Sequence, residues 1–169
     1  MQQELLRQVK NVPWMQKPND YETWRSSTYP PRHLITAVFA VVQKDNSFLF
    51  VKYNNDPASG RQYDLPGGHI DQGETPEETI VREVLEEACV LVRPVMPVGY
   101  YRCFIHGLQK VPDKYPFPES YMAIVYCTIV EERPFIKQHE TIDRLYLSLN
   151  TLKRMKWRED HIKLLNAFT

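Results

Sequence analysis

Three glutamates, Glu83, Glu86 and Glu87, lie close together in one short stretch of the chain. On a helix they are three and four residues apart, so their carboxylates share one face. Like charges at this spacing repel each other by about 0.2–0.5 kcal/mol per pair in water. A divalent cation turns this repulsion into attraction, and oxygen ligands without a nearby histidine or thiol favour Mg²⁺ or Mn²⁺ over zinc. The stretch is therefore a candidate metal site.

A helix over residues 76–88 is expected to carry these glutamates. Thr75 is a favourable N-cap, Pro76 suits the first helical position, and Glu78 completes a capping box. At about 100° per residue, the apolar side chains gather on the side opposite the glutamates. We expect that stripe to face the core; it consists of Ile80, Val81, Val84, Leu85 and Ala88.

Glycines precede this helix at Gly67, Gly68 and Gly73, where they allow a ligand to approach the backbone closely. A helix face rich in glutamate is usually just solvated surface. A solvated helix face would not explain the glycines. It would not explain the positions of Glu74 and Arg82 relative to the three glutamates either.

Residues 68–90, GHIDQGETPEETIVREVLEEACV, resemble the Nudix box G-x5-E-x7-R-E-U-x-E-E-x-G-U, in which U is a bulky aliphatic residue. The matching positions are Gly68, Glu74, Arg82, Glu83, Val84, Glu86, Glu87 and Val90. Cys89 replaces the second glycine. Because cysteine in a left-handed helix end costs about 1 kcal/mol, we expect altered geometry there rather than lost chemistry.

The resemblance implies a metal-dependent pyrophosphohydrolase. Such an enzyme cleaves a phosphoanhydride bond of a nucleoside diphosphate linked to another moiety, by attack of water on phosphorus. The resemblance assigns Arg82 to orienting Glu74 through a charge-assisted pair, and both to the catalytic machinery together with Glu83. It assigns the metal, Mg²⁺ or Mn²⁺, to Glu83, Glu86, Glu87 and Gly68.

The sequence identifies the general base and the substrate contacts less clearly than the metal ligands. Glu140 precedes a late strand, so it is a candidate base or further metal ligand, with a solvent-exposed role equally open. Glu119 is a weaker candidate. The proline that marks many ADP-ribose pyrophosphatases after the box is not evident. Candidate substrate contacts, each of which is more often an ordinary solvated or packing side chain, are Lys52, Arg61, His106 and Tyr115.

The rest of the chain predicts an α/β (α+β) fold. The resemblance makes this a Nudix fold, with a mixed β-sheet sandwiched between helices. Residues 66–68, Pro-Gly-Gly, are expected to break the strand before them, and residues 107–120 to form a proline-rich covering loop. We expect a hairpin from residues 34–42 and 48–53, strands at 63–65, 98–105, 121–130 and 145–149, and a closing helix at 158–168.

The N-terminal segment is set apart by four prolines with aromatic residues between them. We therefore divide the chain into residues 1–33 and a hydrolase domain at residues 34–169. The first part is expected to be a short helix followed by an arm that packs on the core or on a partner. A homodimer formed through this arm is one of the two interpretations.

The composition excludes several classes of protein. Among 169 residues, Lys plus Arg and Asp plus Glu are 21 each, so no overall basic field exists to recruit nucleic acid. No apolar run is long enough for a signal peptide or a bilayer span. Three cysteines without CxxC spacing favour reduced thiols. The expected partner is a nucleotide-type small molecule, and the expected location is cytoplasmic.

Three alternatives remain open. A catalytically silent module that binds a nucleotide or a protein is disfavoured, because such proteins typically lose box glutamates. An isomerase acting on isoprenoid diphosphates needs a cysteine and a glutamate in special contexts, whereas Cys103 and Cys127 lie in plain strand sequence. An acidic helix that binds cations incidentally is the third.

Overall fold

A computed structural model describes residues 3–54, 63–108, 115–137, 141–155 and 157–168 of the chain. Within this part, nine strands form a mixed sheet in the order β1-β2-β7-β8-β3-β4-β5, with β6 paired to β3 and β9 to β4. Only β3 and β8 pair in parallel among the described strands. The strands are β1 (Glu4–Lys10), β2 (Asn19–Arg25), β3 (Ile35–Lys44), β4 (Ser47–Tyr53), β5 (Tyr63–Asp64), β6 (Gly67–His69), β7 (Val90–Ile105), β8 (Glu119–Glu132) and β9 (Thr141–Ser148).

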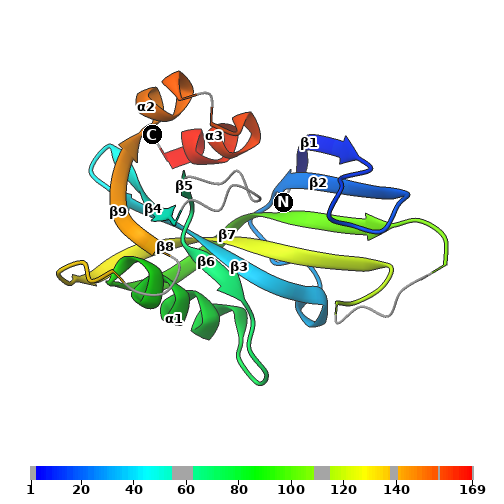
Figure 1. Ribbon diagram of the computed structural model, residues 1–169, viewed down its shortest axis with the longest axis horizontal. Helices are drawn as coiled ribbons and strands as arrows, with labels where there is room; N and C mark the ends of the chain where they lie inside the picture. The colour runs from blue at the N-terminus through cyan, green and yellow to red at the C-terminus, as the bar shows by residue number, and fades with distance from the viewer. Residues whose placement is uncertain (1–2, 55–62, 109–114, 138–140, 156, 169) are drawn as a thin grey trace.

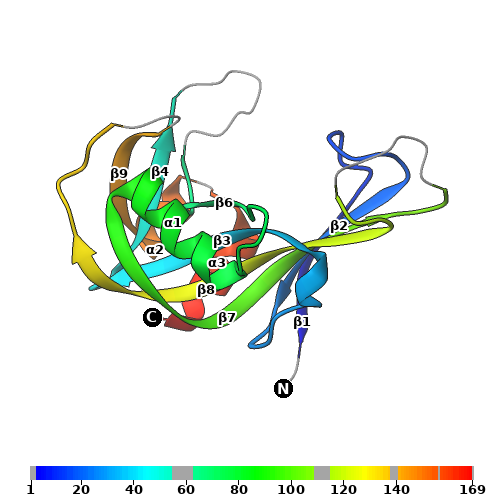
Figure 2. The same cartoon turned by 90° about the horizontal axis from the view of Figure 1, so that it is seen from below.

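Helices cover both faces of the sheet, which confirms the predicted sandwich. Helix α1 (Pro76–Ala88) lies on one side, whereas α2 (Leu149–Arg154) and α3 (Glu159–Leu165) lie on the other (Figure 1). The view from below has α1 in front of the strands that it covers (Figure 2). Two short 3₁₀ helices, η1 (Arg32–Leu34) and η2 (Asn166–Phe168), complete the described elements.

Alternation along β3 divides the core into two layers. Val38 packs in the layer beneath α1, together with Ile80 and Val84 of that helix. Val41 packs in the opposite layer with Leu152 and Leu164 from α2 and α3. Since successive side chains of a strand point to opposite faces, one apolar strand supplies both layers. The apolar stripe predicted for α1 therefore does face the core.

The expected N-terminal helix is wrong. Residues Glu4–Lys10 form β1, which pairs with β2, and β2 in turn pairs with β7, so this segment extends the main sheet. A short isolated helix is marginal in water, and the free edge of β2 offers the same residues a complete ladder of hydrogen bonds.

Other elements confirm or correct the predicted ranges. The hairpin of β3 and β4 is confirmed, although the two strands pair only at Gln43–Lys44 and Ser47–Phe48 before diverging. A break does follow β5, as expected, but it is shorter than residues 66–68, because Gly67–His69 form the separate strand β6. The closing helix predicted at 158–168 is confirmed as α3 followed by η2, and α2 is an additional helix before it. Strand β7 begins earlier than predicted, since register shifts accommodate Pro94 and Pro97.

Two further expectations can be compared with the described residues. All three cysteines are free thiols. None of the helices described is both long and apolar enough to cross a lipid bilayer.

Candidate active site

The start of α1 is fixed by the predicted capping box. The Glu78 amide donates to Thr75 Oγ1 at 3.2 Å, and the Thr75 amide donates to Glu78 Oε2 at 2.8 Å. Pro76 occupies the first turn. Because both ends of the box are satisfied locally, neighbouring residues determine where the helix begins.

The end of α1 keeps the geometry for which glycine is usual. Cys89 has φ 54° and ψ 37°, a left-handed conformation, and its amide donates to Leu85 O at 3.0 Å. The expectation of an altered exit is therefore wrong. The cysteine instead accepts the unfavourable backbone conformation, which costs about 1 kcal/mol, and its buried sulfur receives a hydrogen bond from the Ile136 amide at 3.4 Å.

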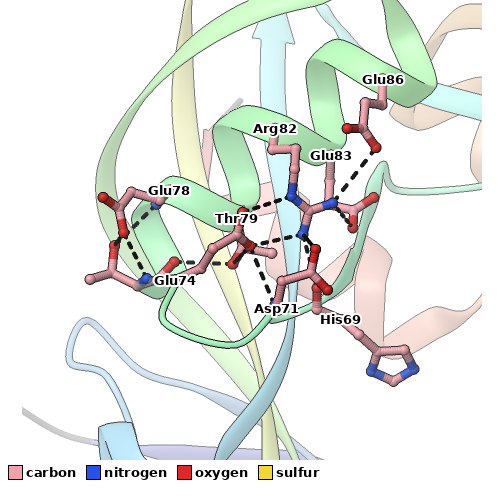
Figure 3. A network of polar contacts seen from close by, with 9 residues as sticks. His69, Asp71, Glu74, Glu78, Thr79, Arg82, Glu83 and Glu86 are labelled. Carbon is pink, nitrogen blue, oxygen red and sulfur yellow. Dashed lines mark hydrogen bonds and ion pairs between the residues drawn. The ribbon is translucent and has the colours of Figure 1, made fainter.

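Arg82 is the centre of a polar network in front of the helix (Figure 3). Its guanidinium binds both oxygens of Glu74, at 2.8 Å from Nε and 2.9 Å from Nη2, and it reaches Glu83 at 2.7 Å. Thr79 Oγ1 also donates to Glu74, at 2.8 Å. The hydrogen bonds from Arg82, and to a smaller extent the one from Thr79, lower the pKa of Glu74 to about 2. The predicted charge-assisted pair of Arg82 and Glu74 is confirmed as a contact. Glu74 is thereby held ionised and fixed in orientation.

Glu87 lies against strands β4 and β6. Its carboxylate accepts hydrogen bonds from the Gly67 amide at 2.8 Å and from the Tyr53 hydroxyl at 3.1 Å. Burial raises the pKa of Glu87 to about 7, against the opposing effect of these two hydrogen bonds. Both donors are neutral, so they do not balance the charge of the ionised carboxylate.

Glu86 lies on the outer side of the same helix. Its side chain is 49% exposed and stands 3.6 Å from Arg82 Nη1. The three box glutamates therefore differ in their surroundings: Glu87 is partly buried against Gly67 and Tyr53, Glu83 is 14% exposed and paired with Arg82, and Glu86 is open to solvent.

The two glycines of β6 have different steric roles. A Cβ on Gly68 would lie 2.4 Å from Glu83 Oε1, whereas a Cβ on Gly67 would lie 2.1 Å from the Val38 carbonyl oxygen. Gly67 also has a φ of +154°. Gly68 thus leaves space for a carboxylate, and Gly67 lets two backbones pack together.

The ladder between β3 and β6 determines which backbone groups face the carboxylates. Ala40 donates to Pro66 O at 2.8 Å and Ile70 donates to Thr36 O at 3.0 Å, on either side of the Val38–Gly68 pair. By antiparallel alternation, the peptide groups of Gly68 turn toward β3, and those of Gly67 and His69 turn to the outer edge. The Gly67 amide accordingly meets Glu87, and the His69 carbonyl accepts from Arg82 at 3.2 Å.

The donor set fits a hard divalent cation. Glu83, Glu86 and Glu87 offer carboxylate oxygens, the ligands that Mg²⁺ and Mn²⁺ prefer. In the described residues, no three acidic, histidine or cysteine side chains already converge as a metal cage. The guanidinium of Arg82 contacts Glu83 and approaches Glu86, while the buried charge of Glu87 has only neutral donors.

The remaining predicted residues are scattered. Lys52 lies over the ring of Tyr63, 5.8 Å from its centroid, and His106 binds Asp20 at 2.8 Å near the far end of the β2–β7 pair. Tyr115 does reach the end of β6, where its ring stacks on that of His69. Glu119 is hydrogen-bonded to Arg102 and Tyr121. Arg61 and Glu140 lie outside the described residues.

Sequence reasoning missed Tyr53 and His69 at this site, and it named Gly67 only as a glycine where a ligand can approach the backbone. Tyr53 and Gly67 hold the carboxylate of Glu87, and His69 contributes both its carbonyl and its ring. Tyr53 and Glu87 are 34 residues apart, so no local pattern connects them. His69 could have been noticed as the residue directly after the two glycines.

The chain is similar to known proteins over most of its length. The chain matches the family model described as NUDIX domain over residues 31–168. It is 28% identical over 152 residues to a protein named ADP-ribose pyrophosphatase from Methanocaldococcus jannaschii, covering 90% of this chain and 80% of that one. A MutT-like protein from Streptomyces ambofaciens is 31% identical over 84 residues, covering 50% of this chain and 52% of that one.

Solved structures resemble the fold at low sequence identity. A pyrophosphohydrolase from Bacillus subtilis superposes with a TM-score of 0.58 at 18% identity, covering 83% of this chain and 77% of that one. A NUDIX hydrolase from Nitrosomonas europaea also gives a TM-score of 0.58 at 18% identity, covering 79% and 86% of the two chains. At this level of identity the similarity concerns the fold alone.

Proposed function

Because this chain belongs to the Nudix family of hydrolases, we propose that it is a divalent-metal-dependent pyrophosphohydrolase acting on nucleoside diphosphates linked to another moiety. The observation that carries the proposal is the carboxylate of Glu87, which is partly buried and bound by the Gly67 amide, on the same helix that carries Glu83 and Glu86. A buried carboxylate with neutral donors gains most from a bound cation, and a diphosphate is the substrate that such a cation would neutralise.

The side chains divide the work as follows. Glu83, Glu86 and Glu87 hold Mg²⁺ or Mn²⁺, which supplies Lewis-acid polarisation of the phosphate oxygens and lowers the pKa of bound water. The Gly67 carbonyl, on the outer edge of β6, is a better candidate backbone ligand than Gly68, whose peptide groups turn toward β3. Arg82 fixes Glu74 and Glu83 relative to each other through three short hydrogen bonds.

The base that activates water remains a proposal. Glu140 is retained as the candidate base or additional ligand. Glu119 is less suitable, since Arg102 and the Tyr121 hydroxyl already engage its carboxylate. A carboxylate committed to two donors is a weak proton acceptor.

ADP-ribose is the first substrate to test. The relative from Methanocaldococcus jannaschii, which carries that activity in its name, aligns with 90% of this chain. The absence of the proline found in many ADP-ribose pyrophosphatases argues for testing other nucleoside diphosphate derivatives beside it. The panel therefore includes nucleoside triphosphates, dinucleoside polyphosphates, nucleotide sugars and capped RNA, with product masses as the readout.

The deciding experiment compares metals and variants on this panel. We expect hydrolysis with Mg²⁺ or Mn²⁺, none after chelation, and recovery when metal is restored. Glu86→Gln and Glu87→Gln should lose activity while their circular dichroism spectra stay unchanged. Glu77→Gln is the matched control, because Glu77 lies on the same helix but pairs with Arg32 at the surface. Full turnover by both box variants would refute the proposed roles.

We also retain a homodimer through the N-terminal segment as a proposal. Strand β1 stands at one end of the described strand order, so its outer edge is available for pairing with a second copy. Sedimentation of the intact chain beside a chain lacking residues 1–10 tests this, and identical monomeric profiles would exclude it.

A further inference from the structure

His69 and Tyr115 form an aromatic pair beside the box. His69 ends β6, and Tyr115 lies in the connection between β7 and β8. Their ring centroids are 5.6 Å apart with an angle of 29° between the planes, and Tyr115 Oη lies 3.2 Å from His69 Nε2. Neither ring has a role in the proposed hydrolysis.

The hydrogen bonds fix the orientation of the imidazole. His69 Nδ1 lies 3.3 Å from the carbonyl oxygen of Thr36, which can only accept. Nδ1 therefore carries the proton of the neutral ring, and Nε2 accepts from the Tyr115 hydroxyl. Both nitrogens are engaged, so the pair is held in one arrangement before any ligand arrives.

The pair lies across β6 from the carboxylates. Alternation along the strand turns the Gly68 position toward Glu83 and the His69 side chain to the opposite face. Figure 3 shows this division: the His69 carbonyl joins the Arg82 network, and its ring points away from that network.

The outer edge of β6 separates the carboxylates from the ring pair. The strand is three residues long and pairs with β3 among the described strands. Gly67 and Gly68 add no side chain there, and the backbone groups of this edge meet Glu87 and Arg82. For a nucleotide whose diphosphate lies at the carboxylates, this short edge is all of β6 that stands between the diphosphate and the ring pair.

Resting on the proposed function, we infer that the His69–Tyr115 pair binds the nucleobase of the substrate by stacking. Every base has a π face, and aromatic side chains in a fixed orientation bind it with little loss of conformational freedom. The pair then determines affinity for the base-bearing half of the substrate, while the metal site handles the diphosphate.

The test compares five phosphates, four with a base and one without. AMP, GMP, CMP and UMP each carry a base, whereas ribose 5-phosphate lacks one. Their dissociation constants, measured by calorimetry with Mg²⁺ present, separate base recognition from phosphate binding. We expect wild type to bind at least one nucleotide more tightly than ribose 5-phosphate. His69→Ala and Tyr115→Ala should each raise the dissociation constant of that nucleotide by about fivefold or more. The dissociation constant of ribose 5-phosphate should change by less than twofold.

Two controls separate stacking from a structural role. Tyr115→Phe keeps the ring and loses the hydroxyl, so it should remain within about threefold of wild type for the nucleotide. His33→Ala removes an exposed histidine elsewhere and should change neither ligand. If the alanine variants bind the nucleotide and ribose 5-phosphate equally more weakly, the pair only holds the connection between β7 and β8 in place, and the inference is overturned. An unchanged nucleotide affinity, or no preference for a base in wild type, would overturn it too.

These measurements do not depend on turnover. If the substrate panel shows no hydrolysis but the binding pattern holds, the proposed function fails and the base site stands. If hydrolysis requires the box glutamates but the alanine variants bind all five ligands as wild type does, the base site fails alone.

Discussion

The Glu87 carboxylate accepts a 2.8 Å hydrogen bond from the backbone amide of Gly67, 20 residues earlier in the chain. This contact joins helix α1 to the short strand β6 and holds the glutamate in a partly buried position. Since the donor is a backbone group, its direction depends on how β6 packs on β3. The position of the acidic cluster is therefore sensitive to the two glycines of β6.

Alanine at these two glycines should have separable effects. Gly67→Ala places a Cβ 2.1 Å from the backbone oxygen of Val38, so we expect a loss of about 2–4 kcal/mol in unfolding free energy. Gly68→Ala meets the flexible end of Glu83 at 2.4 Å, which can move aside. Its stability should fall by less than about 1 kcal/mol, whereas kcat should fall about 100-fold because Glu83 is displaced. Urea unfolding and steady-state kinetics check both, and the reverse order of effects would contradict this account.

Replacing Arg82 with lysine should impair catalysis more than folding. Lysine keeps the charge but cannot bind both oxygens of Glu74 while also reaching Glu83. We expect kcat/KM to fall about 10- to 100-fold. Arg32→Lys is the matched control, since Arg32 binds both oxygens of Glu77 on the same helix at 2.7 and 2.9 Å, outside the acidic cluster. Equal activity of the two lysine variants would show that Arg82 orients nothing that matters for turnover.

The left-handed helix end at Cys89 predicts a difference between two small residues. Both Cys89→Gly and Cys89→Ala lose the sulfur and its hydrogen bond to Ile136. Only glycine also relieves the backbone conformation at φ 54°. We expect the glycine variant to be more stable than the alanine variant by about 1 kcal/mol. Chemical denaturation of the two proteins measures this, and equal midpoints would mean that the conformation relaxes.

His161 should lower the stability of the fold as the pH drops below neutral, while Glu87, whose pKa is raised to about 7, contributes in the opposite direction. The His161 ring is buried, it is hydrogen-bonded to the Tyr101 hydroxyl, and burial followed by the nearby Arg158 puts its pKa well below the usual range. The neighbouring Asp160 opposes this effect, and Arg7 adds to it. Below about pH 6.5, His161 therefore binds a proton in the unfolded chain but not in the folded chain.

His161→Gln removes this titration and serves as the comparison. Between about pH 7.5 and 5.5, the melting temperature of wild type should decrease more steeply than that of the variant. The variant is expected to be less stable at the higher pH, since the contact with Tyr101 is changed, so the slope is the quantity to compare. Parallel slopes in thermal scans would rule out His161 as the responsible group.

The sequence was sufficient for the parts of the site that neighbouring residues control. Thr75, Pro76 and Glu78 determine where α1 begins, and spacing along the helix determines which face carries the glutamates. The box resemblance identified the pairing of Arg82 with Glu74, and the structure confirms that contact. These features depend on side chains within one or two helical turns of each other, so a local pattern contains them.

Only the tertiary structure decided which glutamate is buried and what surrounds the helix. Tyr53 and Gly67 reach Glu87 from other strands, and Tyr115 meets His69 across 46 residues of chain. The N-terminal residues became strand β1 because β2, itself paired with β7, offered them an edge. Strand pairing and burial depend on residues that are distant in the chain, and the free energy of such contacts exists only once the fold has brought them together.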